Sequence, residues 1–110
     1  MPFRELKTEA EFDELLGRGD AFLLIPTTRR LGLRGGVVPP VEALDARLGG
    51  RLPMYVVYDE DTPEIARRYY VPGGHLVFFK GGVELYRVGH GLRGPDDLAT
   101  LVDGYFGLKV

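Results

Sequence analysis

Three arginines lie in a glycine-rich stretch, residues 26–38, between an apolar run and a helical pattern. Arg29, Arg30 and Arg34 therefore come just before the expected start of a helix. The free N–H groups and the dipole of a helix N-terminus favour an anion, and guanidinium groups can bind a carboxylate or phosphate through two parallel hydrogen bonds. Glycine lets a ligand come close to the backbone. The pattern indicates an anion site, but a solvated loop is the plainer interpretation and we prefer it, because such short patterns often occur by chance.

The two histidines are the other side chains that can carry acid–base chemistry near neutral pH. His75 follows Gly73 and Gly74 at the start of an apolar run, and His90 follows Gly89 in a turn-like stretch. They lie far apart in the sequence, and the chain has neither serine nor cysteine, so we find no nucleophilic triad. Two histidines and scattered acids do not indicate a metal site. For His75 we prefer a structural position at the edge of a strand over a functional role. For His90 we likewise prefer a position in a turn.

Composition limits the classes of function further. The 110 residues, 45% of them hydrophobic, predict a single domain over residues 1–110. The absence of cysteine excludes disulfides, thiolate metal sites and cysteine nucleophiles. A formal net charge of −2 argues against general nucleic-acid binding. No apolar stretch approaches the ~20 residues of a membrane span, and the first residues do not resemble a signal peptide. We therefore expect a cytoplasmic protein with no cofactor and with no nucleic-acid or membrane partner.

The first half of the chain predicts two helices and three strands. Thr8 and Glu11 fit a capping box with apolar residues at helical spacing behind them, and Gly17 and Gly19 are expected to stop this helix. The other elements predicted here are a short strand over 3–6, a buried strand over 21–25 that ends at Pro26, a helix over 41–48 and a buried strand over 54–58.

The second half predicts a helix, a hairpin and a final helix. Thr62 is expected to be an N-cap, with Pro63 at the first helical position. A strand over 76–79, a glycine turn over 80–82 and an edge strand over 83–88 form the antiparallel hairpin. The last helix begins at 94–97, and its predicted buried stripe is Leu98, Leu101, Val102 and Tyr105.

This order of elements predicts an α/β sandwich of three layers, in which four helices flank a mixed four- to five-stranded sheet that is parallel in the middle. The order and length resemble thioredoxin, and the chain is identified as a member of the thioredoxin-like superfamily. Four runs carry the resemblance: an acidic turn and helix at 59–71, a strand, lysine and glycine turn at 76–82, a Val-Gly turn at 88–91 and the final helix at 98–106.

Three departures from the family concern its redox site. With Pro40 taken as the proline of the second helix, the segment Gly32-Leu33-Arg34-Gly35 stands where the family has its cysteine pair. Counted back from residues 78–80, the place of the family's cis-proline is Gly74, with Pro72 two residues early, and a one-residue gap would instead give that place to Pro72. The buried acid of the first central strand has no counterpart in residues 22–26. The resemblance therefore implies a member without the Cys-x-x-Cys motif and without thiol-disulfide oxidoreductase activity.

What the resemblance implies about function follows from the peptide groove of the family. Three regions form that groove, and here they correspond to 29–36, 72–75 and 88–91. A redox-inactive, protein-binding module is the first expectation: an assembly or chaperone-type adaptor whose partner is another protein or an extended peptide. Two alternatives stay open. One is a binder or enzyme that uses the Arg/Gly stretch on a small anionic ligand. The other is a structural subunit that forms a homodimer through an edge strand or the glycine-rich face.

Overall fold

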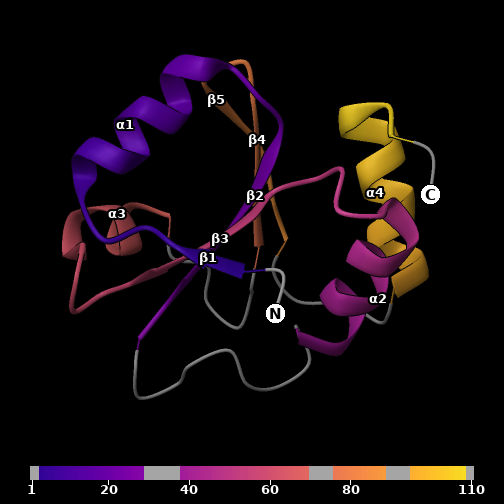
Figure 1. Cartoon of the computed structure of the whole chain (residues 1–110), viewed down its shortest axis with the longest axis horizontal. Helices are drawn as coiled ribbons and strands as arrows, with labels where there is room; N and C mark the ends of the chain where they lie inside the picture. Colours follow the sequence, from indigo (N-terminus) through magenta and orange to yellow (C-terminus); the bar gives the residue numbers. More distant parts are fainter. Residues whose placement is uncertain (1–2, 29–37, 70–75, 89–94, 109–110) are drawn as a thin grey trace.

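The computed structural model describes residues 3–28, 38–69, 76–88 and 95–108. These residues form strands and helices in the predicted order (Figure 1). The strands are β1 (Phe3–Glu5), β2 (Phe22–Thr27), β3 (Met54–Tyr58), β4 (Leu76–Lys80) and β5 (Val83–Val88). The helices are α1 (Glu9–Arg18), α2 (Val38–Leu48), α3 (Pro63–Arg68) and α4 (Pro95–Phe106).

The strands form one mixed sheet in the order β1-β3-β2-β4-β5. β1, β3 and β2 are parallel, with Leu23 of β2 opposite Met54 of β3. β4 is antiparallel to both β2 and β5. The connections between the parallel strands pass through helices, as parallel pairing requires. The predicted parallel centre and antiparallel edge are thus confirmed.

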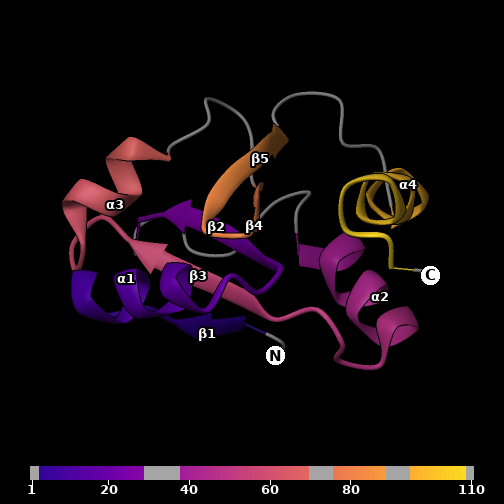
Figure 2. The same ribbon diagram turned by 90° about the horizontal axis from the view of Figure 1, so that it is seen from above.

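Two apolar clusters cover opposite faces of this sheet. Helices α1 and α3 lie on one face, and α2 and α4 lie on the other (Figure 2). On the α1–α3 face, the rings of Phe22 and Phe79 stack with their centroids 4.8 Å apart. On the α2–α4 face, Phe78 packs against Phe106 at 5.2 Å. Neighbouring residues of β4 therefore anchor opposite layers, as the period of two along a strand requires.

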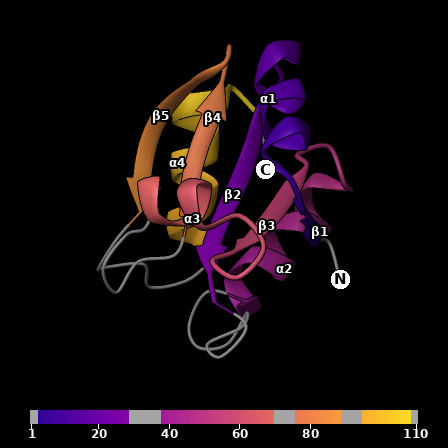
Figure 3. The same cartoon turned by 90° about the vertical axis from the view of Figure 1, so that its left-hand side faces the viewer.

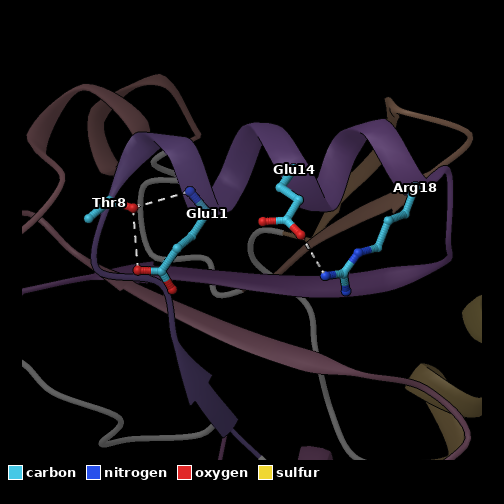
Figure 4. A network of polar contacts seen from close by, with 4 residues as sticks. All are labelled: Thr8, Glu11, Glu14 and Arg18. Carbon is cyan, nitrogen blue, oxygen red and sulfur yellow. Dashed lines mark hydrogen bonds and ion pairs between the residues drawn. The ribbon is translucent and has the colours of Figure 1, made fainter.

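A side-chain cap begins helix α1. The hydroxyl of Thr8 accepts a hydrogen bond from the Glu11 amide at 3.1 Å and donates one to Glu11 Oε1 at 3.3 Å (Figure 4). The predicted cap is confirmed, although the Glu11 carboxylate bonds to the hydroxyl of Thr8 rather than to its backbone N–H. One turn later on the same helix, Arg18 pairs with Glu14 at 3.1 Å.

Helix α1 ends at Gly19 and runs through Gly17. Gly19 has a φ of 71°, the left-handed conformation that glycine adopts without strain, and its N–H donates to the carbonyl of Leu16. The prediction that Gly17 also stops the helix was wrong. A glycine inside a helix weakens it by only about 1 kcal/mol. The buried side chains of Phe12 and Leu15 hold this helix on the sheet regardless.

Strand β2 continues through Pro26 to Thr27, so the prediction that Pro26 ends it was also wrong. Leu23 donates its N–H to the carbonyl of Pro53, and Thr27 accepts from the N–H of Asp59, so the odd residues of β2 bond to β3. The missing N–H of Pro26 therefore falls on the β4 side. The described pairs with β4 end two residues before Pro26, so none of them needs this donor.

Thr62 occupies the predicted N-cap position of α3 without capping it. Its side chain forms no cap hydrogen bond, the residue is 3% exposed, and Oγ1 has no hydrogen-bond partner. Its ψ of 72° departs from the extended value of 156° at the working cap Thr8. The hydroxyl is therefore not aimed at the first turn of the helix.

Helix α4 buries Leu98 and Val102 as predicted, but Tyr105 is not part of its buried stripe. Tyr105 is 38% exposed, whereas the next residue, Phe106, is 6% exposed and packs in the core. The buried positions follow one another at intervals of four. Tyr105 instead lies at the surface, with its ring stacked on that of Tyr86 at 5.1 Å.

The turn between β4 and β5 is held against the end of α1. Gly81 and Gly82 have φ values of 66° and 78°, which only glycine adopts freely, and the predicted glycine turn is thereby confirmed. The N–H of Gly81 donates to the carbonyl of Gly19 at 3.0 Å. A Cβ added at Gly82 would lie 3.1 Å from the carbonyl oxygen of Leu16.

Candidate functional site

All twelve residues predicted from the sequence to form a binding site lie outside the described residues. They are Arg29, Arg30, Gly32, Leu33, Arg34, Gly35, Pro72, Gly73, Gly74, His75, Gly89 and His90. The structure describes the helices and strands that flank them, and these limit the chemistry of the site.

The chain ends that flank the predicted site meet at one end of the sheet. Strand β2 ends at Thr27, and β4, which is antiparallel to it, begins at Leu76. Leu76 is opposite Val88, the last residue of β5. Helices α2 and α4 begin at this same end, which faces downward in Figure 3, with α4 behind the strands. The described chain ends that flank the three predicted segments therefore lie at one end of the sheet.

The start of helix α2 is a weaker anion site than the sequence pattern suggests. Helix α2 begins at Val38 and has no acidic residue in its first turn, so its dipole is not offset there. However, Pro39 and Pro40 follow directly, and proline has no N–H. Two of the four N–H groups that a helix start normally offers are thus absent. An anion would depend mainly on arginine side chains.

Polar side chains from α3 and from the turn that connects β3 to it border this end of the sheet. The N–H of Asp59 donates to the carbonyl of Thr27 at 2.9 Å, and its carboxylate pairs with Arg67 at 3.1 Å. Thr62 brings its unpaired, buried hydroxyl into the same region, since its N–H donates to the carbonyl of Tyr58. The sequence pattern predicts only an N-cap at Thr62.

The interior of the first central strand carries no titratable group. The side chains of residues 22–26 are all buried, and all are apolar. Strand β2 therefore buries no carboxylate over residues 22–26. The chain also supplies no thiol.

Two described groups have clearly shifted pKa values. A hydrogen bond to the Glu64 carboxyl, together with its negative charge, raises the pKa of Glu9. A hydrogen bond to Glu84 raises the pKa of the Arg87 guanidinium. Each shift comes from a partner at the surface. Neither has the character of a catalytic group, whose pKa is moved by burial together with a specific charge.

One cavity of about 170 Å³ lies between α1 and strands β1 and β3. Leu6, Leu15 and the ring of Tyr55 line it with apolar surface. Its charged side chains are Glu11, Glu14 and Arg18, and they already bond to one another or to Thr8 (Figure 4). These pairings leave little in the cavity to select a ligand by charge.

Within the described ranges, no three histidine, aspartate or glutamate residues are grouped as metal ligands would be. In the same ranges, no helix is both long enough and apolar enough to cross a membrane.

No protein-family model and no curated relative matches this sequence. Solved thioredoxins, in contrast, superimpose on nearly the whole chain. The thioredoxin of Fasciola hepatica is 24% identical with a TM-score of 0.71, and 93% of this chain and 98% of that chain are covered. The Plasmodium falciparum thioredoxin is 14% identical, with a TM-score of 0.68 over 93% and 98%. A mutant thioredoxin from Halobacterium salinarum is 20% identical, with a TM-score of 0.68 over 98% and 92%. Likenesses at these identities show the fold.

Proposed function

We propose that this chain, which has the thioredoxin fold and contains no cysteine, is a cytoplasmic protein-binding module without thiol chemistry. Disulfide exchange requires a thiolate that attacks a sulfur atom, and the sequence supplies none. An adaptor that assists the assembly or folding of another protein needs only the binding surface of the fold.

The observation that carries this proposal is the convergence of chain ends at one end of the sheet. Strand β2 ends, strand β4 begins and strand β5 ends there, and α2 and α4 both start there. Loops anchored on rigid strands and helices at one edge are a common basis for binding sites. We assign the contact with an extended peptide of the partner to residues 29–36, 72–75 and 88–91.

The chemistry of these segments favours a peptide over a free anion. Pro39 and Pro40 remove two backbone donors at the start of α2, which weakens the case for a phosphate or carboxylate held by that helix. Glycines at 32, 35, 73 and 74 let a peptide backbone come close, and Leu33 adds an apolar contact.

Affinity capture from a lysate of the source organism, with three versions of the chain as bait, tests this proposal. The wild type and Lys80→Ala serve as a matched pair, because Lys80 is exposed at the opposite end of β4 from Leu76. We expect both to retain the same partner. Leu33→Asp should retain about tenfold less, since a charge replaces an apolar contact in the proposed interface. Retention of no reproducible partner, or equal retention by Leu33→Asp, would contradict the proposal.

A thermal-shift measurement with inorganic phosphate and free carboxylates tests the anion alternative. A rise in Tm that disappears in Arg34→Ala would favour that alternative over peptide binding. We expect no such rise.

A further inference from the structure

The exposed apolar surface of the described residues is concentrated along one edge of the sheet. The exposed large hydrophobic side chains there are Val83, Tyr86 and Tyr105, at 57%, 40% and 38% exposure. Two of them belong to β5, the edge strand, and Tyr105 stacks on Tyr86 from helix α4. Residues 83–88 contain no lysine and no proline, two of the residue types that protect an edge from another strand, and their two charged residues are of opposite sign.

A register shift gives β5 an unusual distribution of side chains. Phe79 is opposite Glu84 and Phe78 is opposite Tyr86, so β5 holds one extra residue, Leu85, at this point. Leu85 and Tyr86 both pack on the α2–α4 face, with Tyr86 against Phe78 at 6.2 Å. A β-bulge therefore turns two successive side chains of the edge strand to the same side.

The bulge also puts the two charged residues of β5 on the same face. Glu84 is opposite Phe79 and Arg87 is opposite Val77, and both of these partners belong to the α1–α3 cluster. In a regular strand, residues three apart point to opposite faces. Here Arg87 Nη2 donates to Glu84 Oε1 at 2.9 Å, which only side chains on one face can do.

Because of this arrangement, β5 is complementary to itself in the antiparallel direction. Around a twofold axis between Leu85 and Tyr86, Glu84 of each copy comes opposite Arg87 of the other. In the same register, Leu85 comes opposite Tyr86, and Val83 opposite Val88. Residues opposite one another in an antiparallel pair must share a face, and opposite charges there stabilise the pair. The bulge satisfies this condition for the charged pair and for Leu85 with Tyr86.

We propose that β5 pairs antiparallel with β5 of a second copy of this chain in this register. The pairing joins two sheets into one and gives the outer backbone groups of β5 on both sides of the bulge hydrogen-bond partners. The two Glu84 carboxylates and two Arg87 guanidiniums then alternate around the axis on the α1–α3 face. Tyr86 and Tyr105 of both copies form one apolar strip on the other face. A closed, twofold interface of this kind buries the same patch on each copy.

Charge reversal at positions 84 and 87 tests both the partner and the register. We expect the wild type to form a dimer in sedimentation equilibrium between about 5 and 500 µM. Glu84→Arg alone and Arg87→Glu alone should each raise the dimer dissociation constant at least about tenfold, because like charges then face one another across the axis. An equimolar mixture of the two variants restores both opposite-charge pairs. It should form a heterodimer that neither variant forms with itself.

The mixture separates the loss of an interface from the loss of folding. A misfolded variant would not regain association on mixing, and circular dichroism of each variant gives a second check. A monomeric wild type over this concentration range would overturn the proposal, even if β5 bound a strand of another protein. If both single variants still form dimers, the interface does not include β5 and the proposal is wrong. A mixture that stays monomeric would overturn the register.

Disulfide trapping gives an independent measure of the register, because the chain has no other thiol. Residues opposite one another in an antiparallel pair have Cα atoms about 4.5–5.5 Å apart, within the range that a disulfide spans. A mixture of Glu84→Cys and Arg87→Cys chains should form a mixed disulfide under mild oxidation. The matched control is a mixture of Glu84→Cys with Lys80→Cys, whose site lies at the far end of the hairpin. Equal trapping in both mixtures would contradict the proposed register.

Discussion

The guanidinium of Arg87 lies over the ring of Tyr69, 5.4 Å from the ring centroid, while it also pairs with Glu84. Tyr69 follows the last residue of α3, and its ring packs against Phe79 at 5.0 Å and Phe12 at 5.6 Å. One arginine of the edge strand thus connects the end of a short helix to the aromatic cluster beneath α1.

Replacement of this arginine should weaken the fold more than loss of an ordinary surface charge does. We expect Arg87→Ala to lower the free energy of unfolding by about 1 kcal/mol, because it removes a cation–π contact and an ion pair together. Urea denaturation at low micromolar concentration measures this change apart from any association. Arg67→Ala is the control, since its pair with Asp59 is exposed, and it should cost less than about 0.5 kcal/mol.

The two threonines at N-cap positions should respond differently to loss of the hydroxyl. Thr8→Ala should lower the free energy of unfolding by about 1 kcal/mol, because it removes the bond to the Glu11 amide. Thr62→Val keeps the shape of a side chain whose buried hydroxyl has no partner, so it should leave stability unchanged or raise it. Thermal denaturation of both variants measures the contrast. A loss in Thr62→Val as large as in Thr8→Ala would show that the hydroxyl has a partner.

The contact between Glu9 and Glu64 should make stability depend on pH. The pKa of Glu9 is raised in the folded chain above its ordinary value of 4.5, mainly by the hydrogen bond to Glu64 and by the charge of that residue. The folded state therefore holds this proton longer than the unfolded state, and stability falls as pH rises from 4.5 through the raised pKa. We expect Glu9→Gln to lose this fall in a Tm series from about pH 4 to 7.

A matched variant separates this effect from the general titration of the protein. Glu14→Gln removes a carboxylate of the same helix that pairs with Arg18 rather than with α3. It should keep the fall in Tm as the pH rises. If both variants lose the fall, or neither does, Glu9 is not its source.

Placing an acid in the central strand β2 should destabilise the chain in a pH-dependent way. The side chain at position 26 is buried, and its nearest neighbours along β2 are apolar or hydroxylic. Pro26→Asp should cost about 1–3 kcal/mol at about pH 8, where burial opposes ionisation. Part of this loss should return at about pH 5, because burial raises the pKa of the new carboxyl and it then binds a proton. Pro26→Ala provides the reference without a charge, and an equal pH response of both variants would contradict the expectation.

Periodicity and turn chemistry predicted most of the fold. The glycine turn at 80–82 and the strands on both sides of it followed from local sequence alone. Tyr105 did not, because helical spacing cannot distinguish a residue at the edge of a buried stripe from one at its centre. Phe106, one position further, is the residue in the core. The extension of β2 past Pro26 depends on which neighbour each N–H faces, and sheet order decides that.

The candidate site was less predictable than the fold. Its twelve residues follow from the family resemblance and from motif positions in three separate segments, and all twelve lie outside the described residues. The structure adds only that the strand ends beside these segments lie at one end of the sheet. The bulge near Leu85 has no sequence signal, since residues 83–88 have the pattern of an ordinary strand. The shared face of Glu84 and Arg87 therefore comes from the structure alone.

The hydrogen bond from Gly81 to Gly19 couples the first helix of the chain to its last hairpin. The two glycines lie far apart in the sequence. Gly19 caps the C-terminus of α1, and its carbonyl accepts the N–H of Gly81 in the turn between β4 and β5. Local opening of the hairpin would expose the end of α1, and fraying of α1 would release the turn. These two parts should behave as one cooperative unit, whose backbone amides share one free energy of opening in hydrogen–deuterium exchange.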